Sequence, residues 1–383
     1  MISKTNRFIG AVLLVTGTTI GAGMLAIPIS TGLSGFFPSL VLMTATWLFM
    51  MLTAFYLLEV NLRLRGETNI ISMVHKTLGR PGEVITWIFY FFFFYSVLAA
   101  YLVGSSQLLE NFIEPWINVD IPSWVWPVGS FLIFGTFVYF GTEVVDFLNR
   151  FLMLGLVAAY LVLIILGFFH VDLSMLGHYN WTYILPAASV VTTSFGYHVI
   201  IPTLTTYLEH DARLLRRAIF VGSFIPFVVY LLWQLLVLGT VPVEGEVSLS
   251  VAAEKGVQIT FYLQQLINSA WVGLAARCFA FFAISTSILG VGLSLKDFLI
   301  DGLKLKQTLT GRLTALLLAF VPPLFFALFY PQGFIMALKY AGIFVVVLFA
   351  LLPALMAWFE RYGKQAKRAF VKSKFKVPGG KFA

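Results

Sequence analysis

Residues 18–28 read TTIGAGMLAIP and lie inside an apolar run that carries no charged residue from Phe8 to Leu58. A related stretch, TTSFGYHVIIP, occupies residues 192–202. A shift of 174 residues superimposes the two stretches without a gap. The identical pairs are Thr18 and Thr192, Thr19 and Thr193, Ile27 and Ile201, and Pro28 and Pro202. The chain therefore contains one motif twice, once in each half.

Glycine interrupts both copies of the motif. Gly21 and Gly23 in the first copy, and Gly196 in the second, lie where a membrane helix would otherwise run unbroken. Unwound backbone is tolerated at membrane depth only where it lines a cavity, and paired interruptions in matching halves are typical of the binding site of a secondary transporter. Small residues also mark close helix packing, which is an alternative for the first copy considered alone. The gapless second copy favours a transporter with two broken helices.

The composition is that of an integral membrane protein. Apolar residues make up 60% of the 383 positions, charged residues 11%, and the mean hydropathy is +0.92. Long apolar runs without alternation predict helices, because a barrel strand would alternate. The single cysteine, Cys278, excludes an intrachain disulfide, and we find no His and Cys spacing typical of a metal site. We expect an all-α membrane protein without a cofactor.

About 20 apolar residues are needed for each membrane span. On that count the sequence predicts ten helices. They lie near residues 8–30, 34–59, 84–112, 122–142, 146–170, 181–208, 216–240, 268–295, 313–330 and 333–359. The motif copies fall in the first and the sixth helix, so each half holds five spans. An odd number of spans inverts the second half relative to the first.

Lys and Arg favour cytoplasmic loops, and their distribution predicts the orientation. With the N-terminus inside, 22 of the 25 Lys and Arg residues fall in cytoplasmic segments. The net charge of +8 then faces the anionic cytoplasmic leaflet, and nucleic-acid binding is not expected. The longest external connection, Val241 to Ile267, is predicted to be a surface loop with short helical pieces or, alternatively, a lid over the cavity.

The two breaks together suit a zwitterion. An exposed helix N-terminus presents unpaired N–H groups to a carboxylate, and free carbonyl groups at a helix C-terminus suit an ammonium group. We expect the amides of Gly21, Ala22 and Gly23 to bind the carboxylate. The carbonyl groups near Thr18, Thr19 and Ser194 are expected to receive the ammonium. The ligand class that this arrangement favours is an amino acid.

Three segments resemble a known family: GTTIGAGMLAIP, SFGYH at Ser194 to His198, and FKVPGGK near the end. Together with the hydropathy pattern of the whole chain, they are similar to the bacterial hydroxy and aromatic amino acid permeases of the amino acid/polyamine/organocation superfamily. The resemblance implies the LeuT-type fold of five plus five inverted helices in the bacterial inner membrane. Its repeats would span about 8–170 and 181–359, followed by a basic tail at 360–383. Family members usually carry an eleventh helix, which would follow the PGGK stretch.

The resemblance also implies a function and a set of site residues. The function is import of an aromatic amino acid, tyrosine first, by ion symport with alternating access. Phe195, Gly196 and Tyr197 would surround the substrate backbone together with Gly21 to Gly23. The substrate ring would stack on Phe195, Tyr197 and either Tyr95 or Tyr101.

The sequence leaves two candidates for the coupling ion, sodium and the proton. In the LeuT-type fold, hydroxyl groups such as those of Ser285 and Thr286, with the carbonyl groups of Gly17 and Ile20, can form a sodium site. His198 lies in the second break, and a histidine can take a proton at physiological pH. The resemblance favours the proton. A sodium-coupled importer of another aromatic or hydroxy amino acid is the alternative.

Two other classes of function are less consistent with the sequence. An ion channel usually presents rings of like charges or carbonyl groups from several subunits, whereas this chain has one asymmetric pair of breaks. A membrane enzyme would need a metal cluster or a nucleophile with its base, and we identify neither. The partners expected are a small-molecule substrate and the lipid bilayer, and the sequence leaves the oligomeric state open.

Overall fold

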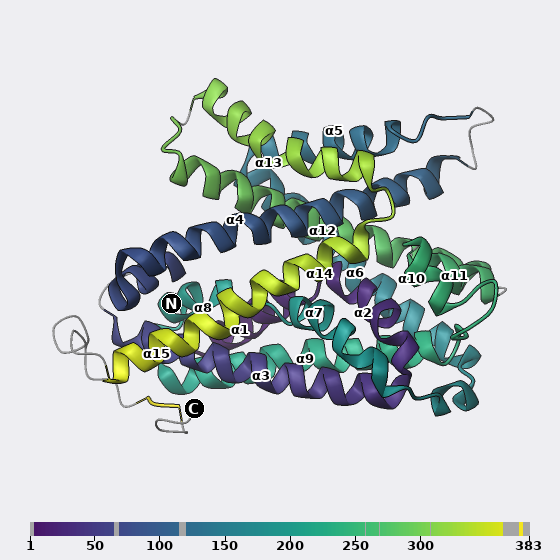
Figure 1. The fold of residues 1–383 in the computed structure, drawn as a ribbon, viewed down its shortest axis with the longest axis horizontal. Coiled ribbons are helices and arrows are strands. Elements are labelled where there is room, and N and C mark those ends of the chain that lie inside the picture. The colour runs from purple at the N-terminus through teal and green to yellow at the C-terminus, as the bar shows by residue number, and fades with distance from the viewer. Residues whose placement is uncertain are drawn as a thin grey trace.

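The computed structural model describes residues 4–64, 69–114, 120–256, 258–267, 269–306, 308–362 and 375–377. This part of the chain is an all-helical bundle whose long helices run side by side along the longest axis of the molecule (Figure 1). Both chain ends lie at one end of the bundle, which we call the terminus-bearing end. The short helices α10 and α11 lie at the other end, which we call the α10–α11 end.

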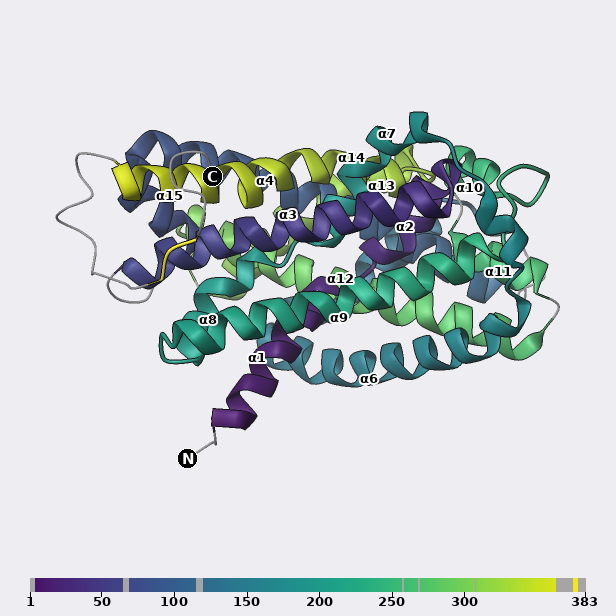
Figure 2. The same cartoon turned by 90° about the horizontal axis from the view of Figure 1, so that it is seen from below.

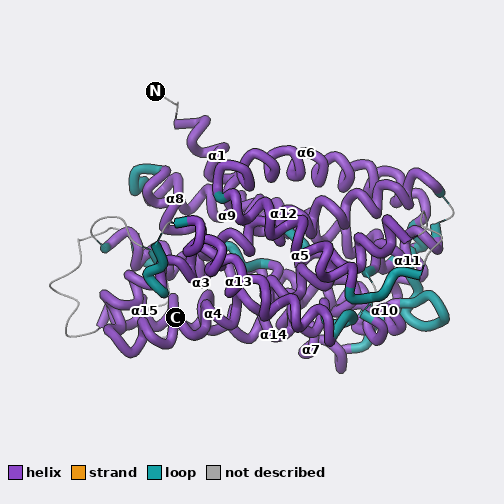
Figure 3. The backbone as a smooth tube through the Cα atoms, turned by 90° about the horizontal axis from the view of Figure 1, so that it is seen from above, coloured by secondary structure: helices purple, strands orange, loops and turns teal. Residues whose placement is uncertain are grey.

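The first span is broken where the sequence predicts. Its halves are α1 (Lys4–Thr19) and α2 (Gly23–Thr31), and the helix axis bends by 53° between them. The break residues Ile20 to Ala22 include Gly21, which costs little to leave unwound because it carries no side chain. The first turns of α1 project from the side of the bundle (Figures 2 and 3).

The second break interrupts the sixth span. Helix α7 (Ile184–Ser194) ends before Phe195, and a single turn, η6 (His198–Ile200), leads into α8 (Ile201–Tyr207). Pro202 lies in the first turn of α8, where its missing N–H group has no helical partner to lose. Helix α2 packs against α7, so the two broken spans lie against each other.

The other spans are long apolar helices. They are α3 (Phe36–Arg63), α4 (Ile70–Ile113), α5 (Val125–Phe140), α6 (Thr142–Gly167), α9 (Ala212–Leu238), α12 (Ala270–Gly302), α13 (Leu309–Phe329) and α14 (Phe334–Val345) continuing into α15 (Leu352–Tyr362). A π-helical turn, Val346–Leu351, joins α14 to α15. In the described residues, eight helices are long and apolar enough to span a membrane, and the bent pair forms a ninth span. Helix α5, at 16 residues, is apolar but shorter than these spans. All ten predicted segments are helical, and nine of them have the length of a span.

The segment before the third span is helical where the sequence predicts a loop. Residues 70–78 form a short helix that starts with a capping box between Asn69 and Ser72, and non-helical Gly79, with φ 74°, kinks α4 after it. Pro81 follows this kink, so the third span itself begins close to the predicted residue 84. Residues 70–78 bury Ile70, Met73 and Val74 against the core, which explains why a polar segment is helical here.

Lys296 is also misplaced by the sequence prediction, which assigns it to a cytoplasmic loop. It lies within α12 and is only 4% exposed. Its ammonium group donates a hydrogen bond to the carbonyl oxygen of Val138, near the C-terminus of α5, at 2.8 Å. A cation there is favoured by the negative end of the α5 dipole, so Lys296 fastens α12 to α5.

The α10–α11 end is closed by the loop between α9 and α12. Helices α10 (Leu249–Lys255) and α11 (Ile259–Leu266) are the short helical pieces expected there. Gln258 donates to the carbonyl oxygen of Gly104 in α4 at 2.7 Å, and Gln107 of α4 donates to that of Gly256 at 3.1 Å. Leu249 packs so closely on Gly32 that a Cβ there would lie 2.8 Å from it.

A buried charge cluster holds the terminus-bearing end together. The carboxylate of Glu59, in α3 and 0% exposed, accepts hydrogen bonds from Arg361 at 2.9 and 2.7 Å. The same carboxylate accepts from the backbone N–H of Val377 at 2.7 Å. Arg63 of α3 donates to Glu360 of α15 at 2.6 Å, so each helix contributes one arginine and one glutamate to two ion pairs. The cluster joins α3, α15 and the described tail residues 375–377.

Candidate functional site

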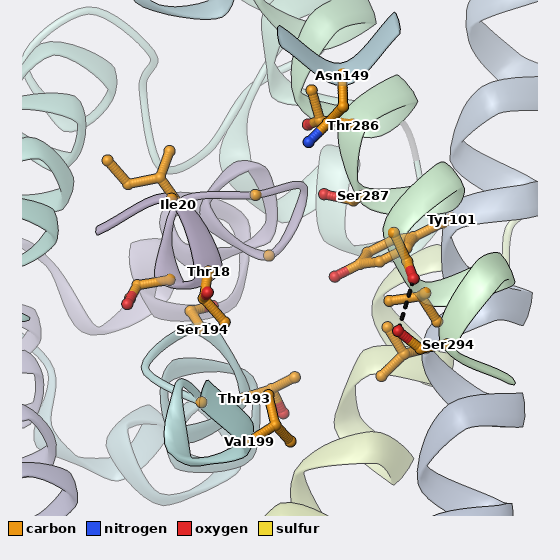
Figure 4. Close-up of a pocket in the computed structure, with 18 of the residues that line it drawn as sticks. Thr18, Ile20, Tyr101, Asn149, Thr193, Ser194, Val199, Thr286, Ser287 and Ser294 are labelled. Carbon is orange, nitrogen blue, oxygen red and sulfur yellow. Dashed lines mark hydrogen bonds between the residues drawn. The ribbon is translucent and has the colours of Figure 1, made fainter. Parts of the chain in front are cut away.

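A cavity of about 530 Å³ lies where the two breaks meet helices α4, α6 and α12. Figure 4 shows Thr18, Ile20 and Ser194 on one side of this cavity, facing Tyr101, Ser287 and Asn149 on the other. The lining residues are Leu13, Leu14, Gly17, Thr18, Thr19, Ile20, Gly21, Gly23, Phe93, Phe94, Val97, Tyr101, Asn149, Met153, Thr193, Ser194, Gly196, Val199, Thr286, Ser287, Gly290, Val291, Ser294 and Phe349. The wall of the cavity is therefore formed by the two copies of the repeated motif and by residues of α1, α4, α6, α12 and the π-helical turn.

The two breaks touch through small residues. A Cβ added to Gly23 would lie 3.0 Å from Ser194 Oγ, which is closer than most real contacts of this kind. A Cβ added to Gly21 would lie 2.7 Å from Ser287 Oγ. Glycine is needed at both positions because the backbone approaches neighbouring side chains directly. The N-terminus of α2 is thereby brought to the edge of the cavity.

Two backbone amides of the first break are unpaired. Among the described residues, no acceptor lies within hydrogen-bond distance of the N–H groups of Gly21 and Gly23, and both residues line the cavity. The Ala22 N–H group donates to Ser287 Oγ at 2.8 Å. Since α2 starts at Gly23, the two free N–H groups lie at the positive end of its dipole and suit a carboxylate.

Carbonyl groups of the α1 C-terminus lie beside these amides. The carbonyl oxygens of Gly17 and Thr18 accept no hydrogen bond from any described residue, and both residues line the cavity. The hydroxyl oxygen of Tyr230 lies 2.6 Å from the carbonyl oxygen of Thr19 and 3.0 Å from that of Ser194, and its one hydrogen can be donated to either of them. An ammonium group next to a bound carboxylate would therefore find free acceptors at Gly17 and Thr18 first.

The described residues that line this cavity carry no formal charge. They include no Asp, Glu, Lys, Arg or His, and their polar atoms belong to the backbone, to hydroxyl groups and to the amide of Asn149. Phe93, Phe94 and Tyr101 of α4 and Phe349 of the π-helical turn supply aromatic surface. Burying an uncompensated charge is costly, so this wall suits a ligand of zero net charge with an apolar or aromatic part.

Three aromatic residues named from the sequence lie outside this wall. Phe195 and Tyr197 are both 0% exposed, and neither lines the cavity. The ring of Phe195 packs against that of Tyr230, with centroids 5.2 Å apart. Tyr95 donates its hydroxyl hydrogen to the carbonyl oxygen of Leu318 at 2.6 Å and lies away from the cavity. Tyr101 does line it, and Phe93 and Phe94 join it on the same helix.

The sodium ligands predicted from the sequence are only partly brought together. Gly17, Ile20 and Thr286 line the cavity, whereas Ser285 lines a separate apolar cavity with Cys278. The hydroxyl group of Thr286 donates to the carbonyl oxygen of Phe282, one turn earlier, at 2.9 Å. Successive residues on a helix point about 100° apart, so Ser285 and Thr286 face different sides of α12.

His198 is buried behind the cavity. It is 0% exposed, and its Nε2 atom lies 3.0 Å from the hydroxyl oxygen of Thr53 in α3. Its ring stacks on that of Phe349, with centroids 5.1 Å apart and planes 2° apart. His198 does not line the cavity, but Phe349 touches both the cavity and the imidazole.

Sequence reasoning missed several residues of this site. They are Tyr230, Asn149, Phe349 and Ser287. A polar residue within a span is a functional candidate by default, and that signal is present for Tyr230, whereas Asn149 lies between the charged residues Asp146 and Arg150. The signal is weak for Phe349, because the chain contains 39 phenylalanines.

The cavity continues toward the terminus-bearing end. Phe94, Val199 and Ser294 line both this cavity and an adjoining one of about 620 Å³ that also reaches Asp297 and Asp301. At the opposite end, the contacts of α10 and α11 with α4 and α2 cover the bundle. In the described residues, the two cavities therefore extend from the breaks toward the terminus-bearing end, whereas α10 and α11 cover the other end.

The family model for the tryptophan/tyrosine permease family matches residues 4–383. The chain belongs to this family. The permease is 34% identical over 381 residues to the tyrosine-specific transport system 1 of Haemophilus influenzae, covering 98% of this chain and 92% of that protein. It is 31% identical over 396 residues to the tryptophan-specific transport protein of the same species, covering 99% and 92%. Glutamine transporter 2 of Aliivibrio fischeri is 27% identical, covering 91% and 88%.

Solved structures place the permease in the LeuT-type fold. A mutant form of the manganese transporter of Eremococcus coleocola superimposes with a TM-score of 0.66 at 14% identity, covering 96% of this chain and 82% of that one. MhsT in complex with L-phenylalanine superimposes with a TM-score of 0.62 at 14% identity, covering 94% and 96%. The predicted fold class is confirmed: the permease is a multi-pass membrane protein of a transporter family.

Proposed function

We propose that this permease imports an aromatic amino acid, tyrosine first, by proton symport with alternating access. The observation that carries the proposal is the uncharged cavity between the two breaks. It offers free amides at Gly21 and Gly23, free carbonyl groups at Gly17 and Thr18, and aromatic rings on α4. A zwitterion with an aromatic side chain complements all three.

Tyrosine is the first choice over tryptophan, phenylalanine or another hydroxy amino acid for two reasons. The tyrosine-specific relative is slightly more similar to this chain than the tryptophan-specific one, at 34% against 31% identity. The hydroxyl groups of Thr286, Ser287 and Ser294 line the cavity from α12 and donate their hydrogens to carbonyl groups of that helix, so their oxygens can accept a bond from a phenol.

The orientation follows from the positive-inside rule. Because the sequence predicts 22 of 25 Lys and Arg residues in segments on the side of the N-terminus, we assign the terminus-bearing end to the cytoplasm of a bacterial inner membrane. The open cavity is then in its inward-facing state, from which the substrate leaves. Closure of this end and opening of the α10–α11 end would complete the cycle.

A proton is the coupling ion that we favour, and His198 is its candidate carrier. The imidazole lies in the second break and contacts the cavity wall through Phe349. Sodium bound by Gly17, Ile20 and Thr286 is the alternative, since all three residues line the cavity, with Ile20 and Thr286 on facing sides of it (Figure 4).

Uptake into proteoliposomes tests the function. We expect labelled tyrosine to accumulate under an imposed inward proton gradient, to saturate, and to exchange with unlabelled substrate on the far side. Unlabelled tryptophan, phenylalanine, serine and glutamine serve as competitors that rank the substrates. Accumulation under a sodium gradient alone would show that sodium, and not the proton, is the coupling ion. Current that does not saturate, without exchange, would contradict the transporter and favour a channel.

A further inference from the structure

One hydroxyl group lies between the two breaks. Tyr230, in the middle of α9, is 0% exposed, and its hydroxyl oxygen is 2.6 Å from the carbonyl oxygen of Thr19 and 3.0 Å from that of Ser194. Thr19 is the last residue of α1, and Ser194 is the last residue of α7. The phenol of Tyr230 therefore contacts the C-terminal ends of α1 and α7, the two half-helices that precede the breaks.

Both carbonyl oxygens carry the partial negative charge of a helix C-terminus. Two such ends pointing at one position repel each other unless a donor or a cation lies between them. In transporters with broken helices, carbonyl groups of this kind coordinate the coupling cation. Here the position holds a phenol, whose single hydrogen can be donated to only one carbonyl group at a time.

We propose that Tyr230 is a positioning residue that takes the place of a cation between the two breaks, holding the ends of α1 and α7 together with its hydroxyl group. The position then accepts no sodium ion while Tyr230 is present. The effect of Tyr230 on transport rests on the proposed function, whereas the position of its hydroxyl group between the two carbonyl groups does not. It restricts any sodium coupling to a second position, between the cavity-lining residues Gly17, Ile20 and Thr286.

The neighbours of Tyr230 fit this role. The ring of Phe195 packs against Tyr230, and Trp233, one turn later on α9, donates to the carbonyl oxygen of Met24 in α2 at 3.1 Å. Two turns earlier, the carbonyl oxygen of Gly222 accepts a bond from Thr16 of α1 at 3.0 Å. Helix α9 thus contacts both halves of the first span, with Tyr230 at the point where they separate.

The cation position is tested first, without substrate. We compare the melting temperature of the purified permease in sodium chloride and in choline chloride at equal ionic strength. Tyr230→Ser removes the ring and leaves a space next to two carbonyl oxygens, so its melting temperature is expected to rise in sodium by several degrees more than that of the wild type. Tyr230→Phe fills the space and is expected to show the wild-type difference. Tyr230→Asn replaces the Ser variant if that protein is not recovered.

The positioning role is tested by exchange of labelled aromatic amino acid in proteoliposomes. Tyr160→Phe is the matched control, because Tyr160 of α6 donates to a backbone carbonyl group of α9, at Val229, at 2.8 Å, away from the breaks. We expect Tyr230→Phe to lower the exchange rate at least tenfold and Tyr160→Phe to lower it less than twofold. The two variants should lose a similar amount of thermal stability.

Two results would overturn the inference. One is an equal sodium effect on the melting temperatures of the wild type and the Ser or Asn variant. The other is an equal loss of exchange in Tyr230→Phe and Tyr160→Phe, which would make the effect one of general stability. If the wild type exchanges no aromatic amino acid, the proposed function fails, whereas the melting experiment still decides the role of Tyr230.

Discussion

At the scale of single residues, the site depends on backbone groups that only small side chains leave accessible. Gly21 and Gly23 keep their N–H groups free at the edge of the cavity, and the nearest side chains leave no room for a Cβ. The chemistry that recognises the ligand therefore comes from the main chain. Side chains shape the cavity around it.

Substituting Gly23 should remove binding without unfolding the chain. In Gly23→Ala the new methyl group meets Ser194 Oγ at 3.0 Å and pushes the two breaks apart. We expect a loss of at least about tenfold in kcat/KM for uptake, which corresponds to about 1.4 kcal/mol. Gly23→Leu should abolish uptake while the protein still inserts.

Gly129→Ala is the matched control for Gly23. It lies in α5, and its Cβ would meet Leu109 at 3.9 Å, an ordinary contact distance. Both variants are assayed for uptake and for the amount of protein in the membrane. Normal transport by Gly23→Leu would contradict the placement of the carboxylate.

His198 is the second residue whose role can be measured directly. If it carries the coupled proton, His198→Gln should retain exchange of labelled substrate but lose the acceleration of uptake by an imposed proton gradient. Thr53→Val removes the hydrogen bond to His198 and keeps the imidazole, so it should retain the response to pH. Uptake by His198→Gln with the wild-type pH dependence would make the imidazole a structural group.

At the scale of helices, the sequence predicts the bundle well because its signals are local. The apolar lengths, the repeated motif and the glycines place all ten helical segments, nine of which are long enough to span a membrane, and both breaks. Helix rotation is not a local property, and there the predictions are less complete. Ser287, rather than Ser285, contacts the first break, because one residue on α12 turns the side chain by about 100°. Lys296 is buried for the same reason.

The role of Tyr230 illustrates the same limit. The segment VVYLLWQLL of α9 shows a tyrosine in an apolar run, but its position between two breaks depends on how α9 packs against α1 and α7. Packing between distant segments also decides that Phe195 and Tyr197 are buried behind the cavity wall.

Helix α1 is tied at its start by an ion pair that depends on pH. Arg7 pairs with Glu209, in the turn after α8, and this hydrogen bond, followed by the charge of Arg7, lowers the pKa of Glu209. A carboxyl group with a lowered pKa contributes stability above its ordinary value of about 4.3 and loses it as the pH falls through the lowered value. The tie is therefore complete at neutral pH.

Breaking this pair should release the first turns of α1. We expect Glu209→Gln to raise amide hydrogen exchange at neutral pH in residues 4–14, and the wild type to show the same increase only in acid. Asp146→Asn removes an exposed pair with Arg150 on α6 and should leave exchange in α1 unchanged. Equal protection of α1 in wild type and Glu209→Gln would show that the pair does not hold the helix.

At the scale of the whole molecule, the tail residues 375–377 join elements that are far apart in the sequence. The backbone of Val377 donates to Glu59 and accepts from Arg361 at 3.0 Å, and the carbonyl oxygen of Phe375 accepts from Arg63 at 3.3 Å. Arg216 of α9 lies over the ring of Phe375 at 5.4 Å. The tail thus fastens α3, α9 and α15 to one another.

Removing the tail contact should lower the stability of the whole bundle. Val377→Pro deletes the N–H group that donates to the buried Glu59, which keeps its hydrogen bonds from Arg361, and a lost hydrogen bond to a charged group costs about 1.5–3 kcal/mol. Val377→Ala keeps that group and is the control. We expect a lower melting temperature for the Pro variant than for the Ala variant. Equal melting temperatures would assign the stability of this end to the four side-chain charges alone.

The absence of charged side chains from the cavity lining has a consequence for the energetics of the membrane. Transport of a zwitterion in this cavity moves no net charge across the membrane potential, because neither the amino acid nor the described residues that line the cavity carry a net charge. The electric charge that accompanies each transported amino acid therefore equals the charge of the coupled cations. The dependence of the reversal potential on the substrate gradient measures this ratio, and a value of one elementary charge for each substrate would correspond to one coupled ion.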